Sequence, residues 1–182
     1  GKCRDVGFDR ALIAGYGHDN RVCAYPSMAA VMDFEGTPAY SVCAALTDKE
    51  EIGSVGGTGM DSMYFENIMA EPVANIKGCG NPLYLRRCLQ NSRMLSSDVS
   101  AGYDPNFAGV FEKNNASIVG NGVTFNKFTG SRGKSGSNDC NAEFVAQVRR
   151  ICDDANISWQ TAELGRVDVG GGSYWSEVST LN

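Results

Sequence analysis

The chain has 182 residues, and 42% of them are hydrophobic, which suits a single globular domain with a sizeable core. Its 16 basic and 21 acidic residues give a formal net charge of -5, which argues against nucleic acid or an anionic membrane as a partner, because both attract basic surfaces. No apolar run approaches the length of a membrane span, so no membrane partner is predicted.

The first 35 residues predict a strand, an acidic residue and a helix. Residues 11–16 form an apolar run, and residues 21–35 place apolar side chains at helical intervals. Asp19 lies between these two segments. It can therefore act either as the N-cap of the helix or as a ligand presented at the end of the strand.

A pair of carboxylates follows the next predicted strand. Residues 40–46 are almost continuously apolar and predict a buried strand, and Glu50 and Glu51 come after it, before a loop rich in glycine. Two adjacent carboxylates repel each other, and a divalent cation would compensate them best if they are partly buried. The alternative to a metal-binding role is a solvated pair on the surface, as in most Glu-Glu dipeptides.

The rest of the chain continues to alternate between helices and strands. A helix is predicted over residues 60–70, and Asp98 follows residues 94–97. The later predicted elements are a short helix at 105–114, strands at 116–119 and 122–128, and a strand at 157–164. Between the last two strands, residues 137–139 are predicted to cap a further helix. The apolar stripe of that helix consists of Phe144, Val145, Val148, Ile151 and Cys152. This alternation predicts an α/β fold, a three-layer α/β/α sandwich with a mixed, mostly parallel sheet, as one domain over residues 1–182.

Acidic side chains thus recur where predicted strands end. In α/β sheets, ligands bind outside the carboxyl ends of the strands, so Asp19, the Glu50–Glu51 pair and Asp98 are expected to converge on one crevice. Crevices rich in carboxylates suit hard or borderline divalent ions.

The seven cysteines form no C-x-x-C pair, and an odd number cannot all pair within one chain. Cys43, in a predicted strand, and Cys152, on a predicted helix, are interpreted as small core residues, which favours a reducing cytoplasm. His18 is the single histidine, so a Cys/His zinc finger is implausible. A surface or supporting role is expected for His18, because it neighbours Asp19 and would point elsewhere.

Several longer motifs occur in collinear order. They are GYGHDNRVCAY at residues 15–25, DKEEIGS at 48–54, GTGM at 57–60, TGSRGKSGS at 129–137 and WQTAELG at 159–165. Together they resemble the bacterial branch of the aspartyl aminopeptidase and aminopeptidase I family of dinuclear-metal exopeptidases. The resemblance extends over residues 1–172.

The resemblance implies a role for each acidic residue. Asp19 would bridge two divalent ions, most readily zinc, with cobalt or manganese as alternatives, while Glu51 and Asp98 would each bind one ion. Glu50 would be the general base that takes a proton from a metal-activated water during removal of the N-terminal residue of a peptide. Relatives also imply a cis peptide bond after Asp19. For Asp98, an ordinary turn aspartate is the alternative.

Glycine-rich loops offer a rival interpretation, a nucleotide-binding domain. Residues 130–135 imitate a phosphate-binding loop, but Phe128 stands where that loop requires glycine, and Ser62 stands where a dinucleotide motif beginning at Gly57 requires its third glycine. The resemblance instead places residues 130–137 near the substrate pocket. Lys134 is therefore a candidate substrate-binding residue, with a solvated loop lysine as the alternative.

The family pattern also contains two metal-binding histidines and an inserted oligomerisation domain that these 182 residues do not supply. The catalytic domain is therefore expected to be incomplete at both ends, and this chain alone to be inactive. A catalytically degenerate structural subunit is the alternative to an enzyme. The resemblance further implies a homo-oligomer, since the family forms large, dodecameric assemblies.

Overall fold

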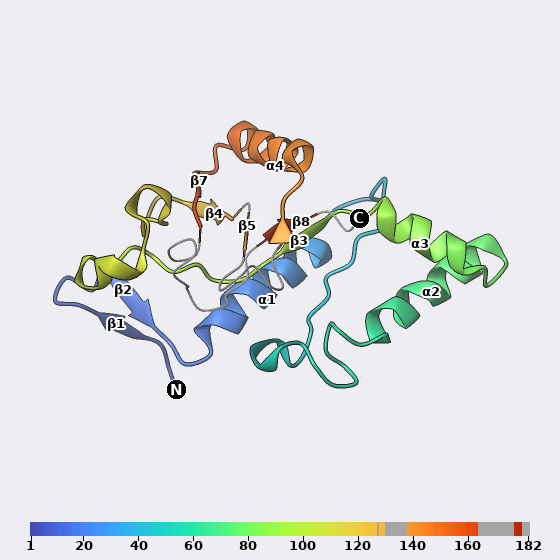
Figure 1. The fold of residues 1–182 in the computed structure, drawn as a ribbon, viewed down its shortest axis with the longest axis horizontal. Helices are drawn as coiled ribbons and strands as arrows, with labels where there is room; N and C mark the ends of the chain where they lie inside the picture. Colours follow the sequence, from blue (N-terminus) through green and yellow to red (C-terminus); the bar gives the residue numbers. More distant parts are fainter. Residues whose placement is uncertain (127, 130–137, 164–176, 180–182) are drawn as a thin grey trace. The chain divides into compact units, whose positions relative to one another are not determined.

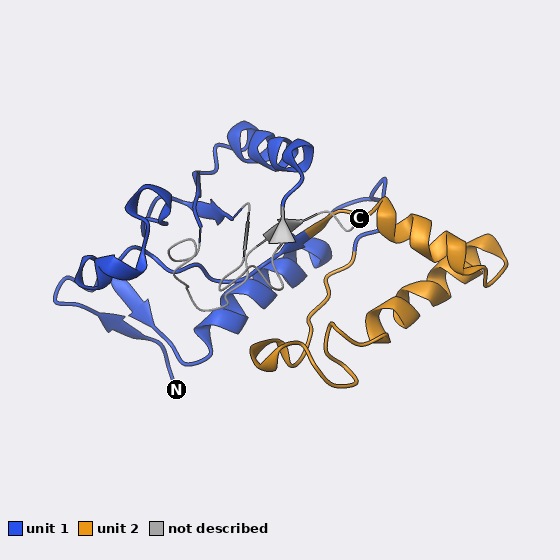
Figure 2. Cartoon of the chain, viewed as in Figure 1, with its two compact units in different colours: residues 1–42, 95–179 blue, residues 43–94, 180–182 orange. Residues whose placement is uncertain are grey.

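The computed structural model describes residues 1–126, 128–129, 138–163 and 177–179 (Figure 1). Its contacts divide the chain into two compact units (Figure 2). Unit 1 comprises Gly1–Val42 and Leu95–Ser179, and unit 2 comprises Cys43–Met94 with Thr180–Asn182. None of the helices in the described ranges has the length and apolar character needed to cross a membrane.

Unit 1 begins with a hairpin and a long helix. Strands β1 (Arg4–Val6) and β2 (Leu12–Ala14) pair antiparallel, and α1 (His18–Met32) follows. The predicted strand and helix are both present, but α1 begins before Asp19, which lies in its first turn, and Gly17 has the left-handed conformation just before the helix.

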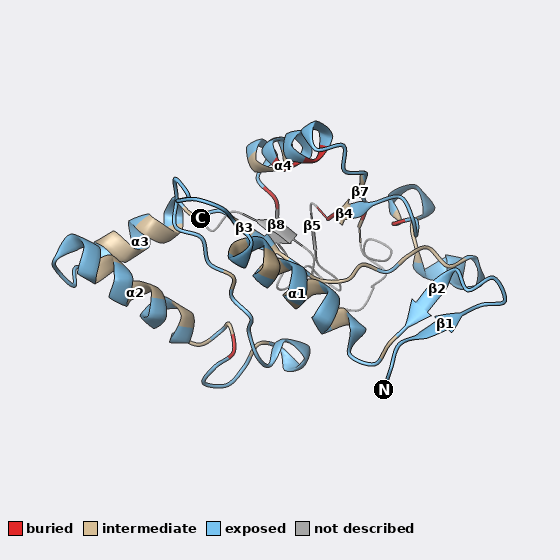
Figure 3. Cartoon of the chain, turned by 180° about the vertical axis from the view of Figure 1, so that it is seen from behind, coloured by how far each residue is buried: buried red, intermediate tan, exposed pale blue. Residues whose placement is uncertain are grey.

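The core of unit 1 lies between α4 (Ala142–Asp154) and the parallel pair β4 (Val123–Phe125) and β7 (Trp159–Thr161). Figure 3 shows buried, red segments on α4 and on the chain beside it. The core side chains are Phe125, Cys140, Val148 and Cys152, with Phe144, Val145 and Trp159 packed against them. Most of the predicted stripe of α4 therefore faces this core, whereas Ile151 remains 64% exposed.

The start of α4 differs from the prediction. Asn141, rather than residues 137–139, caps the helix, and its side-chain oxygen accepts hydrogen bonds from the N–H groups of Glu143 at 3.0 Å and Phe144 at 3.2 Å. Two of the expected capping residues are instead strand β6 (Asn138–Asp139), which pairs antiparallel with β5 (Phe128–Thr129). The third, Ser137, lies outside the described residues.

Residues 116–119 do not form the predicted strand. A single parallel bridge joins Ser117 to Gly102, and the amide side chain of Gln160 bonds both backbone groups of Ile118, at 2.9 and 3.0 Å. The side chain of Gln160 in β7 thus makes the backbone hydrogen bonds that a neighbouring strand would otherwise make. The predicted helix at 105–114 is two short 3-10 helices, η2 (Pro105–Val110) and η3 (Lys113–Asn115).

Unit 2 consists of the 3-10 turn η1 (Glu50–Ile52) and the helices α2 (Tyr64–Lys77) and α3 (Pro82–Gln90), which pack on each other. The predicted helix at 60–70 is thus present but starts and ends later. Gly78 ends α2 in the left-handed conformation, and Asn81 and Pro82 start α3 as N-cap and first helical residue.

The predicted strand over residues 40–46 is wrong. These residues form no regular element, and Tyr40 and Leu46 are 85% and 59% exposed. An apolar run becomes a strand only when another strand supplies hydrogen bonds, and no described strand pairs with this segment. Cys43, expected in the core, is exposed for the same reason.

Helices and strands agree with the predicted α/β fold, while its mixed, mostly parallel sheet stays a prediction, because each described sheet has two strands. The register is described for three pairs, β1–β2, β4–β7 and β5–β6, and β4–β7 is the parallel one. A further pair joins β3 (Met94–Ser96) and β8 (Glu177–Ser179). The three-layer sandwich and the single domain over residues 1–182 stay predictions.

Candidate metal centre

Asp19 is positioned by the start of α1. The N–H of His18 donates to the carbonyl of Gly15 at 3.2 Å, and the guanidinium of Arg21 donates to the carbonyl of Tyr16 at 2.7 Å, so the chain turns sharply into the helix. Asp19 occupies the first helical turn, where a carboxylate is favoured by the helix dipole. Because Gly17 is the N-cap, Asp19 does not cap the helix.

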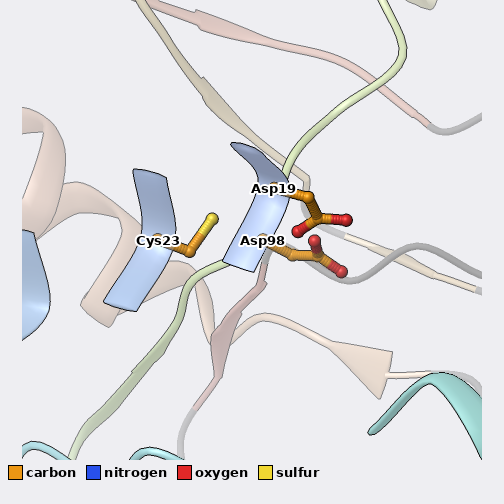
Figure 4. A group of neighbouring side chains, drawn as sticks. All are labelled: Asp19, Cys23 and Asp98. Carbon is orange, nitrogen blue, oxygen red and sulfur yellow. The ribbon is translucent and has the colours of Figure 1, made fainter. Parts of the chain in front are cut away.

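Asp98 reaches the same place from another segment. It follows β3 by two residues, and the N–H of Val99 donates to its Oδ1 at 2.6 Å, which fixes the carboxylate. Asp19, Cys23 and Asp98 each offer a ligand atom, and these atoms all lie within 4.8 Å of one another (Figure 4). All three residues are half-buried.

Cys23 joins this group because it lies four residues after Asp19, on the same face of α1. Burial is the largest influence on the pKa of its thiol and raises it. A hydrogen bond with Ser97 lowers this pKa, and the charges of Asp98 and Asp19 raise it. The thiol is therefore held protonated beside two carboxylates.

The group fits a divalent cation. Two carboxylates that close together repel each other, and a cation between them removes that cost. Zinc accepts carboxylate oxygen and cysteine sulfur alike, whereas magnesium and calcium prefer oxygen alone. The carboxylates of Asp19 and Asp98 thus suit zinc, and the Cys23 thiol would add a sulfur ligand only on losing its proton.

A sequence model of the family described as aminopeptidase I zinc metalloprotease (M18) matches residues 1–180. The chain belongs to the M18 aminopeptidase family. The resemblance seen in the sequence motifs is thereby confirmed.

Curated M18 relatives are bacterial and longer than this chain. The probable M18 family aminopeptidase 1 of Clostridium acetobutylicum is 53% identical over 173 residues, which cover 94% of this chain and 37% of the relative. The chain thus spans little more than a third of the length of the curated relatives it matches.

Two solved M18 structures share the fold. The crystal structure of the aminopeptidase from Thermotoga maritima superposes with a TM-score of 0.84 at 38% identity, covering 94% of this chain and 38% of that one. The crystal structure of aminopeptidase I from Clostridium acetobutylicum gives 0.76 at 49% identity, covering 94% of this chain and 36% of that one.

Two of the other predicted site residues belong to unit 2, and one lies outside the described residues. Glu50 and Glu51 belong to unit 2 and sit in η1, an exposed 3-10 turn, rather than at the end of a strand. Their convergence with Asp19 and Asp98 stays a prediction. Lys134 lies outside the described residues.

Two details of the predicted site are corrected. The peptide bond between Asp19 and Asn20, expected to be cis, is trans, and both residues lie within α1. Cys23 is a member of the cluster that the motifs did not predict, although its spacing of four residues from Asp19 on a predicted helix is a usable signal. His18 is exposed and is not a member of the cluster found among the described residues.

Cys23 gives a test of these electrostatics in protein stripped of metal. Because folding raises the pKa of its thiol, we expect half-maximal alkylation of Cys23 by iodoacetamide at a higher pH in the native than in the urea-unfolded protein. Asp98→Asn removes a negative charge and should lower that midpoint. Peptide mass spectrometry across a pH series measures both shifts, and a native midpoint at or below the unfolded one would contradict the description.

Proposed function

We propose that the protein is a metal-dependent aminopeptidase that hydrolyses the bond after the N-terminal residue of peptides. The observation that carries this proposal is the meeting of Asp19 and Asp98, from separate segments, within a chain that matches the M18 family along nearly its whole length. Membership of the M18 family does not by itself say which residues of this chain bind metal. The carboxylate pair supplies a place for the metal that the family's description names.

Asp19, Asp98 and Glu51 would hold two divalent ions, most readily zinc, with cobalt or manganese as alternatives. Asp19 would serve both ions, because a short carboxylate offers two oxygens, and Asp98 and Glu51 would each serve one. When bound, the ions supply Lewis acidity that lowers the pKa of a water and polarises the peptide carbonyl. The bond from Val99 to Asp98 holds that carboxylate in one orientation for this purpose.

Glu50 would act as the general base. A carboxylate oxygen of Glu50 would accept the proton of the attacking water and later pass it to the leaving amine. Its place in a turn, rather than in a helix or strand, is typical of catalytic residues, which are commonly carried on loops held by rigid elements. Lys134 would contact the substrate.

The finer features of the protein belong to the same proposal. The complete catalytic domain would be a three-layer α/β/α sandwich that assembles into a dodecamer, as the family resemblance implies. A cytoplasmic location is supported by the seven cysteines, which are all free thiols, five of them outside the buried core.

The test of this function compares matched peptides in the full-length protein with zinc. A peptide with a free amino terminus should lose one residue at a time, and its N-acetylated counterpart should stay intact. Mass spectrometry of the products distinguishes the two. Cleavage of the acetylated peptide at internal bonds would contradict the proposal.

A panel of aminoacyl chromogenic substrates then addresses specificity. We expect faster hydrolysis of neutral or apolar residues than of aspartyl or glutamyl ones, in line with the bacterial motifs. A strong preference for acidic residues would reverse this expectation.

A further inference from the structure

The loop that carries Glu50 and Glu51 closes on itself. The N–H of Ser54 donates to the carbonyl of Lys49 at 2.8 Å, so the residues on either side of the two glutamates are joined. Lys49 and Ser54 both have positive φ, of 67° and 57°, which non-glycine residues adopt only when the surroundings impose it. Contacts elsewhere must therefore hold this turn.

The second half of the loop supplies such contacts at the carbonyl of Ser54. The N–H of Asp61 donates to this carbonyl at 3.1 Å and ties residues 54 and 61 together. Gly59 packs against the same group, because a Cβ at position 59 would overlap the carbonyl oxygens of Ser54 and Val55. Only glycine permits so close an approach of two backbone segments.

Gly59 is also anchored and buried. Its carbonyl accepts hydrogen bonds from the N–H of Ser62 at 3.1 Å and from the Ser62 hydroxyl at 2.7 Å, just before α2 begins at Tyr64. Within residues 43–94, the described part of unit 2, Gly59 is the one buried residue. The loop thus has its tightest packing at Gly59 and not at the glutamates.

We propose that Gly59 is a positioning residue for the reaction: by packing on the carbonyl of Ser54, it sets the turn that presents Glu50 and Glu51. The inference rests on the proposed aminopeptidase function and names a residue outside the proposed metal ligands and general base. A side chain at position 59 would push the 54–55 backbone away and break the bond from Asp61. The glutamates would then move together with Ser54, which is bonded to Lys49.

The experiment compares Gly59→Ala with Gly57→Ala in the full-length protein at saturating zinc. A Cβ at Gly57 meets no atom within 4 Å, and this residue has no positive φ, so alanine should be tolerated there. For Gly59→Ala we expect kcat on an aminoacyl substrate to fall by about 10²-fold with KM unchanged, because small displacements of catalytic groups cost that much. Gly57→Ala should keep wild-type kcat.

Ser62→Ala provides a milder variant, should Gly59→Ala fail to fold. It removes one of the two bonds to the carbonyl of Gly59, adds no bulk, and should lower kcat with KM unchanged. Wild-type kcat in a folded Gly59→Ala protein, or in Ser62→Ala where Gly59→Ala does not fold, would overturn the inference. An equal loss in Gly57→Ala would do the same. If the wild-type protein releases no residue from any peptide, it is the proposed function that fails.

Discussion

Glu50→Gln should leave the metal in place and abolish most of the turnover of the full-length protein, by about 10²-fold or more. Glutamine has nearly the same shape as glutamate but cannot accept the proton of the attacking water. Binding of substrate and metal should change little, because neither depends on that proton transfer. Elemental analysis and steady-state rates measured on the same sample check both halves of the prediction.

Glu51→Gln is the matched control, because it makes the same chemical change one residue away in the same turn. Because Glu51 is a proposed metal ligand, the Glu51→Gln protein should contain less metal than the wild type. Added zinc should restore part of its rate of hydrolysis. The two variants therefore separate a base from a ligand. Equal metal loss in both would contradict the assignment of Glu50.

Asp98→Asn should weaken zinc binding by more than the ~10–100-fold that outer-sphere changes cost at metal sites, because it removes a ligand charge itself. Asp19→Asn should have at least as large an effect, since Asp19 is proposed to serve both ions. The physical reason is that two neighbouring carboxylates attract a divalent cation more strongly than one carboxylate does. Competition with a chromogenic chelator measures the affinities.

Asp104→Asn is the control for this pair. Asp104 is also half-buried in unit 1, but it caps η2 through its bond to the N–H of Asn106 at 2.8 Å, and asparagine caps equally well. Zinc affinity should stay at the wild-type value. If Asp98→Asn and Asp104→Asn behave alike, the cluster does not bind zinc.

The sequence predicts structure correctly where nearby residues in the chain determine it. The stripe on α4 follows the helical period, so Val148 and Cys152 were assigned to the core correctly. Asp19 likewise follows a strand and opens a helix, because both neighbouring patterns lie within a few residues of it.

The errors came where distant partners decide the structure. Residues 40–46 look like a strand only if another strand is assumed beside them, and Ile118 is bonded by the side chain of Gln160, which lies 42 positions later. The meeting of Cys23 with Asp98 also depends on chain folding, since β3 brings Asp98 to α1. Periodicity carries no information on such contacts.

The most direct test of the site is to locate zinc in crystals of the full-length protein by anomalous scattering at the zinc edge. We expect an anomalous peak at roughly 2.0–2.2 Å, the usual zinc–oxygen distance, from a carboxylate oxygen of Asp19. A carboxylate oxygen of Asp98 should lie at the same distance from a zinc ion that Asp19 binds. Zinc bound elsewhere, with Asp19 and Asp98 both free of metal, would contradict the metal centre and the aminopeptidase mechanism built on it.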